Sequence, residues 1–151
     1  MTHVVAPAPD VVPAKAGTQF EAVEARLDAH PDAQSLLRLA EEVLEAWIVA
    51  RGATPTGEQR EGFRLLALHH QGASGAPSFN ACRETCREIA YHYNLLTVEA
   101  PEDAAQCLAM MAMLVRHLTL FVGGKLQVEG LGDFCCASRP VRQEQATIAE
   151  G

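Results

Sequence analysis

The sequence is poor in aromatic residues, which occupy 5% of its 151 positions, and β-branched residues are also sparse. Both kinds of side chain are favoured in strands, so their scarcity argues against a protein built from β-sheets. Alanine, leucine and glutamate are abundant instead, and all three are good helix formers. Because 48% of the residues are hydrophobic, a chain of this length can bury one substantial core. We therefore predict an all-α protein.

Basic residues are scarce as well, because 12 Lys and Arg stand against 19 Asp and Glu, and the net charge is -7. Tight binding to nucleic acid needs clustered cations that displace the counterions of the phosphate backbone. Two short basic pairs occur, Arg60 with Arg64 and Arg83 with Arg87, but glutamates lie beside both. That mixture indicates a solvated, salt-bridged helix face. The composition argues against nucleic acid as a partner.

The sequence lacks a run of about eighteen uncharged apolar residues, which a membrane-spanning helix requires. The longest candidate, residues 107–122, contains Arg116 and His117, so we expect no membrane span. The N-terminus has prolines and an aspartate where a signal peptide has an apolar run. The five cysteines are odd in number and irregularly spaced, which disfavours a secreted disulfide framework. We expect a cytoplasmic protein with reduced thiols.

Apolar periodicity divides the chain into a flexible leader (residues 1–17), a helical domain (18–136) and a flexible polar tail (137–151). The expected helices span about residues 18–30, 32–51, 56–72, 79–96 and 101–122. Thr18 and Glu21, like Thr56 and Gln59, have the spacing of a capping box at a helix start. A glycine pair at 123–124 should end the last helix, with a short extended piece after it. The expected fold is a compact bundle of about five helices.

The fifth expected helix has two apolar faces. One continuous arc, which includes Met111 and Leu118, is typical of a core-facing surface. Ala109, Met113 and Leu120 lie on the opposite side, beyond the part that a surface helix normally buries. Either this helix runs through the middle of the bundle, or its second face contacts another subunit. Ala109, Met113 and Leu120 are therefore candidate interface residues.

Cys82 and Cys86 are one helical turn apart, so two thiolates can reach one metal ion or take part in one redox event. Antiparallel packing about the turn near Ser74 brings His70 to the level of Cys82. Cys82, Cys86 and His70 are therefore a candidate site for zinc or another thiophilic metal. However, both cysteines lie among apolar residues, where a thiol is commonly an inert, small hydrophobic group, and no fourth ligand is obvious. On that interpretation no cofactor is expected.

Two further segments contain side chains that could take part in a reaction. Cys135 and Cys136 are adjacent in a glycine-flanked stretch that we expect to be exposed, which favours thiol reactivity. His69, His70 and Gly72 resemble the phosphoacceptor segment of histidine phosphotransfer domains, which are helical bundles with an exposed histidine. The resemblance covers four residues. Those domains have a Lys-Gly pair just after the histidine, whereas this chain has glutamine and then glycine.

The familiar catalytic motifs are absent, since the sequence has no Walker loop, G-x-S-x-G elbow, H-E-x-x-H helix or dinucleotide fingerprint. This absence disfavours a standard enzyme, although active sites without a local signature exist. The two-sided fifth helix favours a non-enzymatic interaction or regulatory module that binds a protein partner or forms a homodimer. The alternative is a thiol- or metal-based sensor that uses Cys82, Cys86 and His70, or Cys135 and Cys136.

Overall fold

The computed structural model of the chain describes residues 16–131, and their side chains from Phe20 onward. Within this range the fold is all-α and contains no strand, which confirms the predicted fold class. The elements are α2 (Ala16–Asp28), α3 (Ala33–Ala50), α4 (Arg64–Ala73), the 3₁₀ helix η1 (Pro77–Cys82), α5 (Arg83–Asn94), the π-helical η2 (Leu95–Glu99) and α6 (Ala104–Val128). The predicted tail lies outside the described residues, as does all of the predicted leader except its last two positions.

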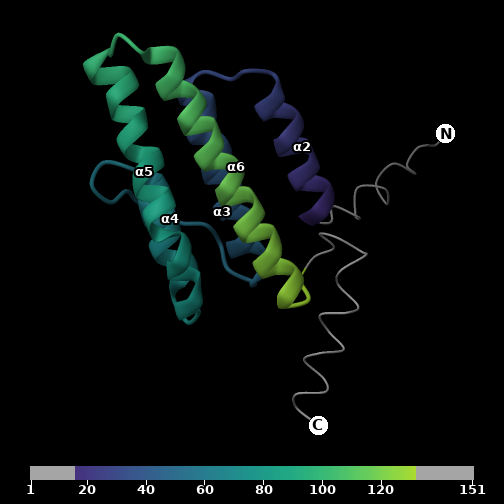
Figure 1. Ribbon diagram of the computed structural model, residues 1–151. Helices are drawn as coiled ribbons and strands as arrows, with labels where there is room; N and C mark the ends of the chain where they lie inside the picture. The colour runs from purple at the N-terminus through teal and green to yellow at the C-terminus, as the bar shows by residue number, and fades with distance from the viewer. Residues whose placement is uncertain (1–15, 132–151) are drawn as a thin grey trace, which may run out of the picture.

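The helices form a bundle in which the long helix α6 packs along several of the others. In Figure 1, α6 lies between α5 and α2, with α3 behind it. It packs against all three of these helices, while α4 packs against α3 and α5. One hydrophobic core joins side chains from every helix, and Trp47, Phe79, Met111 and Leu118 are among its fully buried members. The core therefore lies between the inner face of α6 and the sides of α2, α3, α4 and α5 that face it.

Helix α3 follows directly from its sequence. Asp32 caps it, because the Asp32 carboxylate accepts a hydrogen bond of 2.8 Å from the backbone N–H of Ser35. Its buried side chains recur with helical spacing at Leu36, Leu39, Ala40, Val43, Leu44, Trp47 and Ile48. Gly52 follows the helix with a φ of +87°, a conformation that glycine adopts without strain. The predicted span of residues 32–51 is confirmed.

The predicted start of the third helix is wrong, because α4 begins at Arg64 instead of near Thr56. The side-chain amide of Gln71 accepts a hydrogen bond from the backbone N–H of Thr56 and also donates to the carbonyl of Thr54, both at 2.8 Å. These bonds hold the segment before α4 as a loop against the helix. Gly62, with a φ of +86°, then makes a tight turn just before the helix begins. Thr18 does not cap its helix either, since it lies inside α2.

The predicted fourth helix consists of η1, α5 and η2 in succession. Within η1, the Ser78 hydroxyl accepts a hydrogen bond of 2.6 Å from Lys125 on α6. The predicted helix break at Gly123 and Gly124 is also wrong, because α6 continues to Val128. Continuing the helix buries Leu126 in the core, and that burial outweighs the roughly 1 kcal/mol by which each glycine disfavours a helix.

Candidate functional site

The structure separates the two apolar faces of α6. Met111, Val115 and Leu118 are fully buried in the core. Met113 and Leu120, by contrast, keep 41% and 50% of their surface accessible to solvent, and Ala109 is exposed beside them. The helix is therefore not enclosed on all sides by the described part of the chain. Of the two arrangements that the sequence allowed, the central one does not occur within the described residues.

The exposed side of α6 carries no Asp, Glu, Lys or Arg among its exposed positions beyond the first turn. We define the outer face of α6 by its exposed residues after that turn: Gln106, Ala109, Met110, Met113, His117, Leu120 and Val128. At 100° per residue these positions form one stripe, about 33 Å long at 1.5 Å per residue. An uncharged stripe of this length stands out on a chain whose net charge is -7.

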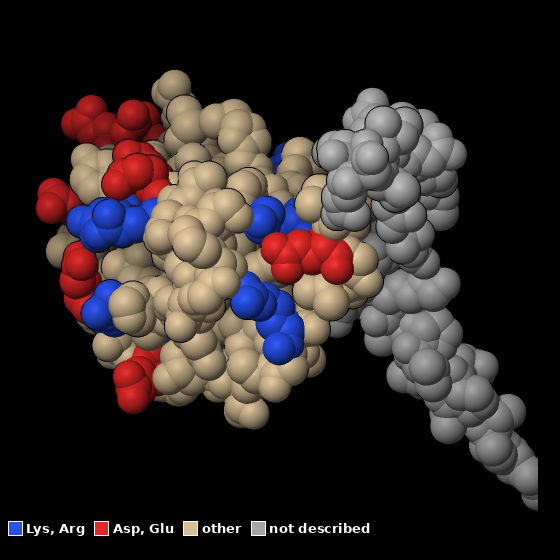
Figure 2. All heavy atoms as spheres, turned by 90° about the horizontal axis from the view of Figure 1, so that it is seen from below, with Lys and Arg blue, Asp and Glu red and all other residues tan. Residues whose placement is uncertain are grey.

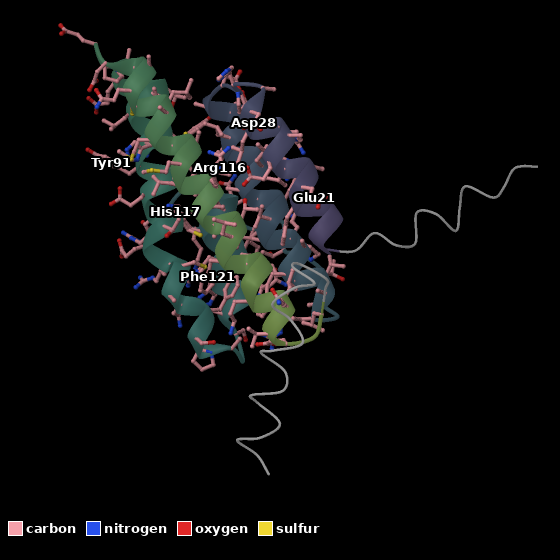
Figure 3. The ribbon with its side chains drawn as sticks, turned by 45° about the vertical axis from the view of Figure 1, so that its right-hand side comes forward. Glu21, Asp28, Tyr91, Arg116, His117 and Phe121 are labelled. Carbon is pink, nitrogen blue, oxygen red and sulfur yellow. The ribbon has the colours of Figure 1, made fainter. Side chains whose placement is uncertain are left out.

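Charged groups lie at the border of the outer face. The guanidinium of Arg116 forms ion pairs with Glu24 at 3.1 Å and with Asp28 at 3.3 Å, both on α2. Figure 3 shows Arg116 and Asp28 on this side of α6, and the exposed Tyr91 of α5 on the other side. An apolar centre between polar borders is the usual anatomy of a protein–protein contact.

The same helix is long and apolar enough, by length and composition alone, to cross a membrane. The mean hydropathy of its most apolar window is 1.6, and 39% of that window is buried inside the bundle. Core helices of soluble proteins meet the same criteria. In addition, Arg116 in the middle of this helix is paired with two carboxylates of α2. Length and composition alone therefore do not identify α6 as a membrane span.

The thiols of Cys82 and Cys86 are both buried, and the histidine beside them is His69. The Cys82 thiol donates to the carbonyl of Phe79 at 3.3 Å, and His69 Nε2 lies 3.2 Å from the same carbonyl. When Cys82 is ionised, hydrogen bonds from Cys86 and then from His69 lower the pKa of Cys82 to about 6, although burial opposes the shift. The hydrogen bond to Cys82, together with burial, raises the pKa of Cys86.

His70 does not join the two cysteines. It is exposed, whereas His69 is only 4% exposed and stacks on the Phe79 ring with centroids 5.5 Å apart. No group of three His, Cys, Asp or Glu side chains in residues 16–131 is arranged to hold a metal ion. The expected grouping of Cys82, Cys86 and His70 is therefore not formed, and a metal site here remains only a sequence-based prediction.

The helical phase of α4 explains why His69 was missed. Its buried residues include Leu65, Leu68, His69 and Gly72, which have the i, i+3, i+4, i+7 spacing of one helix face. His70 was predicted to be the neighbour of Cys82 instead, because the adjacent leucines at 65 and 66 make the two helical phases hard to distinguish. Burial also removes His69 from the resemblance to phosphotransfer domains, whose acceptor histidine is exposed. Cys135 and Cys136 lie outside the described residues.

Basic side chains are not gathered into one surface on the end of the bundle shown in Figure 2. Lys and Arg appear there as separate groups, with acidic side chains close to several of them and uncharged surface between. Several described arginines are ion-paired, such as Arg26 with Glu42 and Arg64 with Glu45. This part of the surface has local groups of charge instead of a continuous basic strip.

Comparison with protein families, curated proteins and solved structures finds no match for this chain. No activity, ligand or partner is therefore transferred to it from a relative. The functional proposals rest on the residues described above and on their geometry.

Proposed function

We propose that this protein is a helical interaction module that self-associates as a homodimer through the outer face of α6. The observation that carries the proposal is the exposure of an uncharged, largely apolar stripe, including Met113 and Leu120, on a strongly acidic chain. Removing apolar surface from water stabilises a complex by about 25 cal/mol per Å². Large exposed patches of this kind usually mark interaction sites.

The pattern of charge supports a second copy as the occupant. Two chains of net charge -7 repel each other unless they meet where acidic groups are absent. The outer face is such a region, and two acids at its border, Glu24 and Asp28, are already paired with Arg116.

The order of side-chain sizes along α6 also suits a symmetric contact. In an antiparallel pair of α6 helices that cross midway between Ala109 and Leu120, each Ala109 lies opposite Leu120 of the other copy. A small residue then faces a large one at both ends of the contact, as interdigitating helices require. Because a two-fold interface uses the same patch on both copies, one stripe is sufficient.

The test is the molar mass of the protein in solution, measured by size-exclusion chromatography with light scattering over a series of concentrations. The full chain should form a dimer. Met113→Glu and Leu120→Glu should be monomeric with unchanged helical circular dichroism, because each places a charge in the contact without touching the core. Val49→Glu is the matched control, since Val49 is 58% exposed on α3 and the charge change is the same. It should remain dimeric.

Two results would refute the homodimer. One is a monomeric wild-type chain at every concentration. The other is dissociation of the Val49→Glu control as readily as of Met113→Glu. A wild-type monomer that captures a different protein through Met113 would likewise replace this proposal with a heteromeric one.

A second candidate function is thiol sensing, which the lowered pKa of Cys82 favours. The thiolate is the reactive form of cysteine, and Cys86 lies close enough to hydrogen-bond to Cys82. The test is the ultraviolet absorbance of thiolate in the native protein against pH, with Cys135 and Cys136 replaced by serine. One thiol should ionise with a midpoint near pH 6, and this step should be absent in Cys82→Ser. If no native thiol ionises below its ordinary range, Cys82 is an inert core residue.

A further inference from the structure

A small polar cleft lies between α4, the start of α5 and the loop before α4. Its volume is about 80 Å³, and its wall includes the side chains of Arg60, Arg83 and Arg87. His69 and His70 contribute their rings from α4. Three segments that are separate in the sequence thus bring five cationic or protonatable groups to one small space. No element of the proposed dimer contact is part of this cleft.

The charges in the cleft are not balanced by carboxylates of the described residues. Glu61 is the one carboxylate in its wall, and it forms an ion pair with Arg87 at 3.3 Å. Arg60 and Arg83 form no ion pair with any described residue, although the sequence contains more acids than bases. By contrast, the exposed arginines Arg26 and Arg38 each contact carboxylates. Two unpaired guanidinium groups at one concave site indicate an anion as the missing partner.

The size and the donors of the cleft limit the class of anion. Clefts that hold drug-sized ligands have volumes of roughly 300–1,000 Å³, so a space of about 80 Å³ suits a single oxyanion group. Guanidinium groups present forked N–H donors that match the oxygens of phosphate. The Asn80 side chain, in the wall of the same cleft, can add a neutral donor.

We propose that this cleft binds a phosphate group, either as inorganic phosphate or as the terminal group of a small phosphate monoester. Arg60 and Arg83 supply the charge-assisted hydrogen bonds, and Asn80 and His70 complete the wall around the oxygens. Arg87 stays paired with Glu61 and positions that side of the cleft. The site works in a monomer as well as in a dimer, so it does not depend on the proposed self-association.

The experiment is calorimetric titration of the full chain with sodium phosphate at constant ionic strength, with sodium chloride as the blank. Saturable binding of one phosphate per chain is expected. Arg60→Gln and Arg83→Gln should each weaken it about tenfold or more, which corresponds to the loss of one charge-assisted hydrogen bond of about 1.4 kcal/mol. Arg51→Gln is the matched control, because Arg51 is also exposed but lies outside the cleft. It should bind as wild type does.

A second titration with glycerol phosphate distinguishes the two sources of the group. Tighter binding of the ester than of inorganic phosphate assigns the site to a monoester, and the reverse assigns it to the free ion. The proposal is overturned if phosphate fails to saturate, or if Arg60→Gln and Arg83→Gln bind it as well as wild type. It is also overturned if Arg51→Gln loses as much affinity as they do, because the effect would then come from net charge. Circular dichroism of each variant checks that the fold is retained.

Discussion

Replacing Gly72 with alanine should destabilise the protein, although alanine is the better helix former. A Cβ atom at this position would lie 2.9 Å from Trp47 Cδ1 and 3.1 Å from Phe79 Cε2. The two rings are fully buried and stacked, with centroids 4.7 Å apart. The Trp47 indole also donates a hydrogen bond of 2.9 Å to the carbonyl of Gly72. The ring therefore cannot move away from the added methyl group without disturbing both contacts.

The expected magnitude follows from three contributions. Overpacking a dense core costs about 1–3 kcal/mol. Straining the indole hydrogen bond costs about 1 kcal/mol more. The helix propensity of alanine offsets about 1 kcal/mol, so the free energy of unfolding should fall by about 1–3 kcal/mol. Gly124→Ala on α6 is the matched control, because nothing lies within 4 Å of its Cβ position. This control should gain about 0.5–1 kcal/mol.

Urea unfolding, followed by far-UV circular dichroism and by the fluorescence of Trp47, the only tryptophan, measures both changes. The midpoints should move in opposite directions while the m-values stay equal, which identifies changes in stability alone. All variants are compared at one protein concentration, since self-association adds to apparent stability. If Gly72→Ala stabilises the protein as much as Gly124→Ala does, the close packing of Trp47 and Phe79 around Gly72 is refuted.

Two other predictions use the same unfolding assay. Leu126→Ala should lower the free energy of unfolding by about 2–5 kcal/mol, while Val49→Ala, at an exposed position of α3 outside the outer face of α6, should change it by less than about 0.5 kcal/mol. Equally small effects would mean that α6 does not pack into the core beyond its glycine pair. The pKa of Cys82 is about 6 in the folded protein, whereas its ordinary value is 9.0. The free energy of unfolding should therefore rise as pH increases between these two values, and this contribution should be lost as pH falls through 6. Cys82→Ser should remove that rise, whereas the raised pKa of Cys86 acts in the opposite sense only at higher pH. An unchanged pH profile in Cys82→Ser would contradict the assignment.

Local patterns in the sequence were sufficient to predict the all-α class and the position of α3. The cap at Asp32, the apolar spacing through Trp47 and the glycine after the helix all act within one element. The two apolar faces of α6 were also evident from its periodicity. Which of these faces is buried depends on the helices around it, because periodicity alone does not distinguish a core from a contact surface.

The errors occur where a distant residue competes with a local signal. Thr56 has the spacing of a helix cap, but Gln71 from the following helix takes its backbone N–H. The glycine pair before Lys125 has the form of a helix end, but burial of Leu126 and the bond from Lys125 to Ser78 favour continuation. Local propensities amount to about 1 kcal/mol per residue, and burying one large apolar side chain exceeds that.

The candidate sites divide in the same way. Ala109, Met113 and Leu120 could be selected from the sequence because all three lie on one helix, whose geometry is fixed by its own hydrogen bonds. The sequence did not show that His69 is the neighbour of Cys82, or that Arg60 and Arg83 line one cleft, because each of these contacts joins separate segments of the chain. Composition and periodicity determined that this chain forms helices and where most of them lie. Only the packing of those helices decided which side chains meet, since that depends on contacts between residues far apart in the chain.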